Sequence, residues 1–174
     1  LCFASFRQLK VFFVIFIFFF SFNLQAFEFK EVKTDKGIKF WFVEDRNIKL
    51  VSLSFSFSGG AIFDSEKKEG TTNLMTSLLD EGTENFSSLD YKLALKNTGA
   101  KIYFSTDREK IDGTFRVVSS QLQKGFWLLQ ETINHPQFDQ NEITKVKKQI
   151  EASLKIDQSN VSTIASDLFN ENFF

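Results

Sequence analysis

Residues 70–83 read GTTNLMTSLLDEGT, a short segment that runs from a glycine to a Gly-Thr pair. Its apolar residues recur at helical spacing: Leu74, Met75, Leu78 and Leu79. This spacing predicts a helix over Thr71–Glu81 with one apolar face. Gly82 follows directly, and a glycine at this position is a typical helix stop.

Three strands are expected before this helix. The clearest is Lys49–Ser58, where apolar residues alternate with serines and so place apolar groups on one face and hydroxyls on the other. A Gly-Gly pair at 59–60 ends it. Phe27–Lys33 and Gly37–Glu44 are predicted to form a hairpin around a turn at 35–37.

Two strands and four helical segments are expected after the first helix. One helix opens at Ser87, which has capping-box spacing to Asp90, and ends at Gly99. The strands are Lys101–Thr106 and Lys110–Val118. The next helix is capped by Ser120, ends at His135-Pro136 and has an apolar stripe of Leu122, Phe126, Leu129 and Ile133. A further helix is capped by Asp139 and has a stripe of Ile143, Val146, Ile150 and Leu154, and a last helical segment covers Val161–Phe169. This order predicts an α+β fold, a mostly antiparallel sheet with helices packed on one face.

Composition narrows the chemistry that the chain can perform. Its 174 residues fit about one domain. Cys2 is the only cysteine and His135 the only histidine, which excludes a disulfide framework and a multi-histidine metal site. His135 directly precedes Pro136 and is interpreted as a turn residue rather than a lone general base. The net charge of −1 gives no support for a nucleic-acid partner.

Residues 1–26 predict a secretory signal, and 27–174 the folded domain. Arg7 and Lys10 precede an apolar run at 11–22, which is shorter than the ~20 residues of a membrane-spanning helix but fits a signal core of ~7–15. We expect cleavage after Ala26 and a periplasmic or secreted protein; without cleavage the run would anchor the chain in the membrane. The sequence begins with Leu1 and ends on Phe174 without a polar tail, so the domain is expected to be incomplete at its C-terminus.

Several short motifs occur in a fixed order between Phe57 and Phe138. They are Ser58-Gly59-Gly60, Gly70, Glu81-Gly82-Thr83, Gly99-Ala100, Ser105-Thr106-Asp107 and His135-Pro136-Gln137-Phe138. In this order they make the stretch resemble the N-terminal domain of the insulinase/pitrilysin family of zinc metallopeptidases, which includes the mitochondrial processing peptidases. The resemblance implies the metallohydrolase-like α+β fold of that family.

In that family the helix after the glycine carries the zinc motif H-x-x-E-H. Its two histidines share one helix face and bind zinc, the Glu between them activates the zinc-bound water, and a Glu further along the chain completes the ligand set. Counted from the flanking glycines, the two histidine positions here hold Asn73 and Ser77, and the glutamate position holds Thr76. Glu151 lies within a residue or two of the downstream glutamate position.

These replacements predict a chain that is not catalytic by itself. Amide and hydroxyl groups do not replace imidazole as zinc ligands, and Thr76 cannot serve as a general base near neutral pH. One carboxylate, even if it is Glu151, does not hold a catalytic zinc. No cofactor is therefore expected in this chain, and zinc is expected in a catalytic partner.

The resemblance also implies a partner. Some family members are heterodimers in which a catalytic subunit and a subunit without the zinc motif enclose a chamber for extended peptides. The leading hypothesis is a non-catalytic subunit that helps to bind and enclose peptide substrates beside a homologous zinc peptidase. Two alternatives stay open: an active metalloendopeptidase whose site lies in a missing domain, and a membrane-tethered binding module.

Two other groups of residues are given structural interpretations. Four phenylalanines are assigned to the core rather than to a peptide-binding wall: Phe55, Phe57, Phe63 and Phe86. Asp80 and Glu81 lie beside the altered motif, where a weak cation site is disfavoured because adjacent acids on a helix point in different directions.

Overall fold

The computed structural model describes residues 29–173, which fall into two compact units divided after Ile48. The predicted signal segment 1–26 lies outside the described residues. Within the described part of the chain, no helix is both long and apolar enough to cross a membrane.

The first unit is a β-hairpin. Its strands β1 (Lys30–Lys33) and β2 (Lys39–Phe42) pair antiparallel, with Val32 opposite Phe40. The turn between them contains Gly37 at φ 85°, a conformation that glycine adopts without steric cost. The predicted hairpin is confirmed, with both strands shorter than expected.

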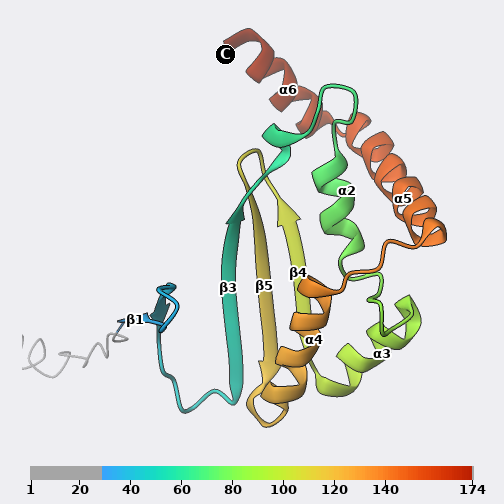
Figure 1. Cartoon of the computed structure of the whole chain (residues 1–174). Coiled ribbons are helices and arrows are strands. Elements are labelled where there is room, and N and C mark those ends of the chain that lie inside the picture. Colours follow the sequence, from blue (N-terminus) through green and yellow to red (C-terminus); the bar gives the residue numbers. More distant parts are fainter. Residues whose placement is uncertain (1–28, 174) are drawn as a thin grey trace, which may run out of the picture. The chain divides into compact units, whose positions relative to one another are not determined.

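The second unit is built on a three-stranded antiparallel sheet. Its strands are β3 (Leu50–Ser58), β4 (Lys101–Thr106) and β5 (Lys110–Val118), in the spatial order β3-β5-β4. Figure 1 shows β5 between its two neighbours. The sequence prediction of these strands is confirmed to within one residue.

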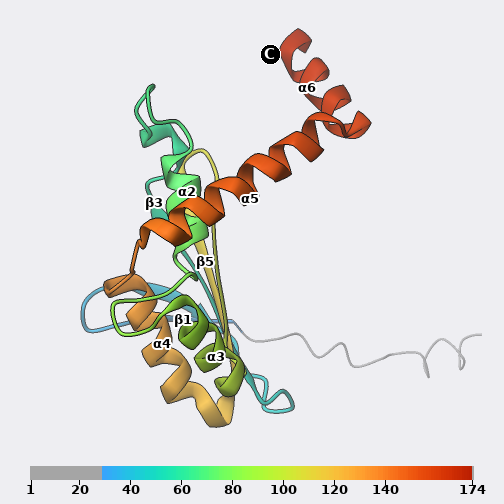
Figure 2. The same ribbon diagram turned by 90° about the vertical axis from the view of Figure 1, so that its right-hand side faces the viewer.

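Five α-helices accompany the sheet: α2 (Thr71–Leu78), α3 (Ser88–Thr98), α4 (Leu122–Asn134), α5 (Gln140–Gln158) and α6 (Val161–Phe173). Helix α2 packs on β4, α4 packs on β5, α3 lies beside α4, and α5 crosses α2 (Figure 2). Short 3₁₀ turns, η1 (Ala61–Phe63) and η2 (Ser119–Gln121), lie at strand ends. The predicted α+β class, mostly antiparallel with helices on one face, is confirmed.

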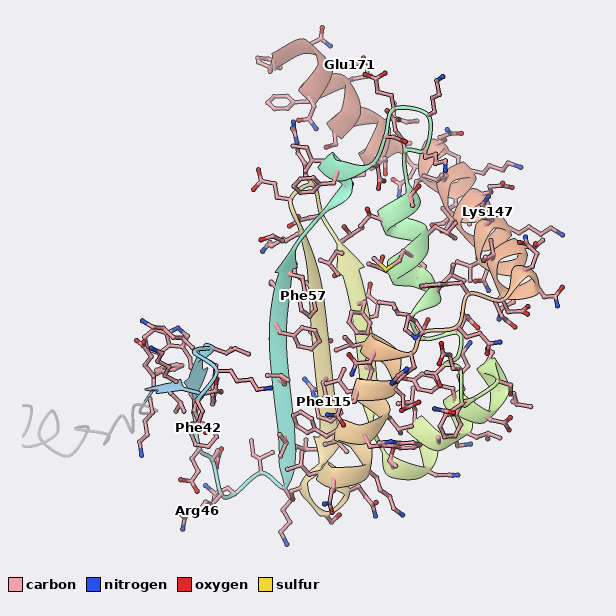
Figure 3. All side chains as sticks on the ribbon, in the orientation of Figure 1. Phe42, Arg46, Phe57, Phe115, Lys147 and Glu171 are labelled. Carbon is pink, nitrogen blue, oxygen red and sulfur yellow. The ribbon has the colours of Figure 1, made fainter. Side chains whose placement is uncertain are left out.

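The sheet has one apolar and one polar face, as the alternation in β3 predicts. Side chains under the helices are buried, including Ile102 and Phe104 of β4 and Phe115 and Val117 of β5. Those pointing the other way are exposed: Ser52, Ser54, Ser56, Thr114 and Arg116. The hydrophobic core therefore lies between the sheet and the helices, and Phe115 lies where α4 crosses β5 (Figure 3).

The buried face of α4 differs from the predicted stripe. Phe126 and Ile133 are each 40% exposed, whereas Gly125, Leu128 and Thr132 are buried. Gly125 explains the difference, because a Cβ at that position would lie 2.8 Å from Val117 Cγ2. The glycine lets the backbone of α4 approach the sheet closely, and this contact rotates the apolar stripe away from the predicted residues.

The helix ends follow capping chemistry at most of the predicted positions. The Ser87 hydroxyl accepts a hydrogen bond from the Asp90 amide at 3.2 Å, and Gly99 ends α3 at φ 62°. Asp139 caps α5 through the Asn141 amide at 2.8 Å. The predicted cap Ser120 is wrong: it lies inside η2, and α4 starts at Leu122 without a side-chain cap.

Candidate functional site

Helix α2 carries the residues predicted to occupy the zinc-motif positions, and its start is fixed by a neighbouring acid. Gly70 precedes it at φ 84°, and the Asp64 carboxylate accepts hydrogen bonds from the Thr72 amide at 3.1 Å and the Thr72 hydroxyl at 2.6 Å. The hydrogen bond from the Thr72 hydroxyl is the main reason why the pKa of Asp64 lies below its ordinary value. Helix α2 ends at Leu78, three residues before the predicted Glu81.

The three motif positions do not share one environment. Asn73 is exposed, Thr76 is buried, and Ser77 is half-buried. The Thr76 hydroxyl donates a hydrogen bond of 2.9 Å to the Asn73 carbonyl oxygen, so its proton is held by its own helix. Thr76 and Ser77 line one hollow together, and Asn73 is not among its lining residues.

This hollow, of about 370 Å³, lies between α2, β4 and α5. Its lining residues are Thr76, Ser77, Asp80 and Glu81, with Tyr103 and Phe104 of β4, and Val146, Gln149, Ile150 and Ser153 of α5. The hollow therefore combines hydroxyl and amide groups with an apolar wall and two acids.

Glu151 is not brought to the hollow. It is exposed on α5 and lines a second hollow of about 590 Å³ with residues 67–71 and Lys147. The residues of α5 that line the first hollow are Val146, Gln149, Ile150 and Ser153. Counting along the sequence placed the downstream position to within a residue or two, but each residue turns a helix by about 100° and so changes the face.

Glu81 is held in a charged cluster that ties three elements together. Its side chain is 9% exposed, and its Oε2 accepts hydrogen bonds from Lys92 Nζ at 2.7 Å, Lys145 Nζ at 2.8 Å and Ser88 Oγ at 2.7 Å. Lys145 Nζ also lies 2.5 Å from Glu142 Oε2. Burial opposes the charged form, but the hydrogen bonds outweigh it and lower the pKa of Glu81 to about 2. A charged carboxylate thus joins α3 and α5 to the turn after α2.

Asp80 lies next to Glu81 but in a different electrostatic situation. It is half-buried, and no other side chain in the described part of the chain forms an ion pair or hydrogen bond with its carboxylate. Burial, together with the charge of Glu81, raises the pKa of Asp80 above its ordinary value. Both nearby lysines are engaged by Glu81, so Asp80 is the carboxylate that the hollow leaves unpaired.

The donor groups of the hollow do not fit the zinc ion of a metallopeptidase. Thr76 and Ser77 offer hydroxyls, and Glu81 is committed to two lysines, so no imidazole or free carboxylate pair faces a common point. Among residues 29–173, no group of three or more His, Cys, Asp or Glu side chains is placed to hold a metal ion.

The remaining candidate residues lie away from the hollow. His135 ends α4 and is exposed, with Nδ1 3.6 Å from Glu84 Oε2. Phe55 and Phe86 pack against the core as predicted, but Phe57 and Phe63 are 48% and 74% exposed, so their assignment to the core is wrong. Sequence reasoning did not single out Gln149 and Ser153, because neither has a chemical signature outside its place on α5.

Comparisons with known proteins identify a family and relatives to which this chain is similar. The family described as "Insulinase (Peptidase family M16)" matches residues 40–174. The "Non-peptidase homolog YmxG" of Helicobacter pylori is 22% identical over 131 residues, 75% of this chain and 30% of that protein. The human "Mitochondrial-processing peptidase subunit beta" is 23% identical over 124 residues, 71% of this chain and 25% of that protein.

A solved structure shares the fold. The crystal structure of a peptidase M16 inactive domain from Pseudomonas fluorescens superposes with a TM-score of 0.70 at 21% identity, over 80% of this chain and 34% of that one. The chain thus spans about a quarter to a third of the length of these relatives.

Proposed function

Because the chain belongs to the insulinase family, peptidase family M16, we propose that it is a non-catalytic member that binds peptides beside a zinc-bearing homologue. One observation carries the proposal. Helix α2 keeps its place against β4 and α5, while the motif positions hold Asn73, Thr76 and Ser77. The chain has the fold of the family, and the positions that we assign to its zinc motif hold no zinc ligand and no general base.

The loss of chemistry follows from the side chains themselves. A hydrolytic zinc site needs three protein ligands of the imidazole, thiolate or carboxylate type, with a water in the fourth position. Here the α2 positions supply an amide and a hydroxyl, and the α5 residues that line the hollow are Val146, Gln149, Ile150 and Ser153, none of which is a zinc ligand. At the predicted general-base position, the Thr76 hydroxyl donates a hydrogen bond to the Asn73 carbonyl oxygen. A hydroxyl has no basic character near neutral pH.

The names of two relatives support a partner-dependent role. One is a non-peptidase homologue, and another is a subunit of a processing peptidase. We propose that the partner is a homologous chain with an intact H-x-x-E-H, that zinc is bound there, and that extended peptides are the shared ligand. Delivery by residues 1–26 to the periplasm or the exterior belongs to the same proposal, with membrane anchoring as its variant.

A second candidate follows from the length of the chain. It spans only a quarter to a third of its relatives, so a zinc motif elsewhere in a longer protein would make that protein a metalloendopeptidase. Reading the coding sequence beyond Phe174 for a second H-x-x-E-H separates the two candidates.

The test is the metal content and the peptidase activity of the purified protein. We expect less than one tenth of a zinc ion per chain after dialysis against micromolar zinc, and no cleavage of fluorogenic peptides. An active family peptidase, treated in the same way, is the positive control. Stoichiometric zinc or chelator-sensitive cleavage that Ser77→Ala or Asn73→Ala removes would overturn the proposal.

A further inference from the structure

We propose that a basic row on the face of the three-stranded sheet that points away from the helices binds an acidic residue of an extended peptide. The basic row consists of Ser52 of β3, Arg116 of β5 and Lys101 of β4. The inference rests on the proposed peptide-binding function and adds a preference for aspartate or glutamate at one place on the sheet. Three observations support it: the register of the strands, the absence of an acid in contact with the row, and the hydroxyls beside it.

The register of the sheet places two positive charges directly opposite each other. Arg116 is the partner of Lys101 across the β4–β5 pair and of Ser52 across the β3–β5 pair, with β5 in the middle of the sheet (Figure 1). Residues opposite each other in an antiparallel pair have Cβ atoms about 4.5–5.5 Å apart, and like charges in these positions repel. Both basic side chains are exposed. A carboxylate bound between them would remove the repulsion, a gain that an isolated surface lysine does not offer.

No acid in the described part of the chain contacts the basic row. Among residues 29–173, neither Lys101 nor Arg116 forms an ion pair. The acid on the same face of β5 is Asp112, four residues from Arg116 or about 13 Å along the strand. Asp112 is bonded there to the Ser56 hydroxyl and lies 3.8 Å from Lys110 Nζ. The basic row therefore carries two positive charges in a chain whose net charge is −1.

The groups of the basic row and its surroundings suit a carboxylate. Ser52 is exposed, as are Ser54 and Thr114, which are opposite each other in the adjoining position of the sheet. An arginine presents parallel N–H groups to a carboxylate, a lysine adds a point charge, and a serine hydroxyl can donate a further hydrogen bond. The basic row thus offers three kinds of donor to an aspartate or glutamate side chain.

The basic row lies within reach of a peptide that occupies the first hollow. Tyr103, which lines that hollow, is two residues from Lys101 along β4, or about 7 Å. An extended peptide advances by about 3.3 Å per residue, so two of its residues cover this distance. The hollow itself is lined by the acids Asp80 and Glu81. An acidic residue of the peptide is therefore directed to the basic row and away from the hollow.

The second hollow differs from the basic row in its charges. It is lined by Lys67, Lys68 and Lys147, but also by Glu69 and Glu151. An acidic peptide residue would meet repulsion there as well as attraction. At the basic row, the register brings together two cations and a hydroxyl without an acid.

The experiment measures binding of rhodamine-labelled twelve-residue peptides to the full-length protein by anisotropy. The peptides share an Ala/Ser/Val sequence and differ at one central residue: glutamate, glutamine or lysine. At low salt we expect the glutamate peptide to bind about threefold to fivefold more tightly than the glutamine peptide, the range of two exposed ion pairs. Salt at about 0.15 M should reduce this difference, because it screens exposed charges.

Two arginine variants locate the preference. Arg116→Gln is expected to remove it. Arg108→Gln removes the same charge from the exposed turn between β4 and β5 and is expected to keep it. Equal loss of the preference in both variants would overturn the inference, because the net charge of the protein and not the basic row would then be responsible.

A charge exchange tests the register directly. Lys101→Glu places an acid opposite Arg116, where opposite charges stabilise a cross-strand pair. We expect this variant to unfold at a slightly higher temperature than the wild type at low salt, and to bind the glutamate and glutamine peptides equally. A preference for glutamate that survives in this variant would overturn the inference.

The remaining outcomes separate the inference from the proposed function. Equal binding of the glutamate and glutamine peptides by the wild type, or tighter binding of the lysine peptide, overturns the inference and leaves peptide binding standing. Self-association of the protein that Arg116→Gln abolishes, measured by light scattering without peptide, would assign the basic row to a second copy and also overturn it. Absence of binding by every peptide overturns both the inference and the proposed function.

Discussion

The two halves of the helical layer over the three-stranded sheet are built differently. Under α3 and α4, Tyr91, Phe115 and Val117 are fully buried and the helix backbone touches the sheet at Gly125. Around α2 and α5, a hollow remains open and the helices are joined by the charged cluster of Glu81. The first half is stabilised by close apolar packing. The second half is packed less closely, because it contains the hollow and the carboxylate of Asp80, which has no partner among the described side chains.

The largest effect is expected from Phe115→Ala in the packed half. The ring is 0% exposed and lies edge-on to Phe126 at 5.2 Å between ring centroids. Removing it leaves a cavity that the surrounding residues cannot fill, which lowers the free energy of unfolding by about 3–5 kcal/mol. Urea denaturation monitored by circular dichroism measures the change. A loss below about 1 kcal/mol would show that this half is not the main source of stability.

Glu81→Gln in the second half is expected to cost about 2–3 kcal/mol, because it leaves two lysines facing a neutral amide. The effect depends on pH. The pKa of Glu81 is lowered from 4.5 to about 2, so its stabilisation is complete above about pH 5 and is lost as the pH falls towards 2. Denaturation of both proteins between pH 7 and pH 3 measures this. If the free energy of unfolding fell equally with pH in the wild type and in Glu81→Gln, the stabilisation could not be assigned to the charged carboxylate of Glu81.

The contrast between the halves explains what could be predicted from the sequence. Strand alternation in β3 and the Ser87 and Gly99 caps depend on local chemistry, and the structure confirms them. The stripe on α4 was misplaced because Gly125 carries no hydrophobic signal, although it sets the contact with Val117.

In the site, positions Asn73, Thr76 and Ser77 followed from counting between glycines, whereas the pairing of Glu81 with Lys145 joins residues 64 apart in sequence. No local pattern shows such a contact. Ser153 lines the hollow and Glu151 does not, because the rotation of α5 about its axis decides which of its residues face α2. Tertiary packing determines that rotation.

A smaller effect is expected from Tyr91→Phe, which removes a hydroxyl that joins α3 to α4. The Tyr91 hydroxyl is bonded to the Thr132 hydroxyl, which itself donates to the Leu128 carbonyl oxygen at 2.9 Å. Loss of this buried hydrogen bond should lower the free energy of unfolding by about 1 kcal/mol while the ring keeps its packing. Chemical denaturation checks it, with Tyr103→Phe, at a side chain that is 64% exposed, as the control that should change little.

The smallest and opposite effect is expected from Asp80→Asn. Because the pKa of Asp80 is raised, its contribution to stability is present at low pH and is lost as the pH rises through its folded pKa. At pH 7 the neutral amide should therefore increase the free energy of unfolding by a few tenths of a kcal/mol, on the order of what relieving a half-buried charge yields. Thermal denaturation at pH 7 and pH 4 tests the sign. A clear decrease at pH 7 would mean that the ionised carboxylate of Asp80 stabilises the fold, against this expectation.

The most direct test of the central claim is a reconstitution with the native partner. The protein is purified with a tag from its native source, the bound proteins are identified by mass spectrometry, and peptide cleavage is compared for the complex and for this protein alone. The account predicts stoichiometric recovery of a homologous chain with an intact H-x-x-E-H, cleavage by the complex only, and loss of cleavage when the Glu of that partner motif is replaced by Gln. Recovery of the protein without such a partner, or cleavage that this protein performs alone, would contradict it.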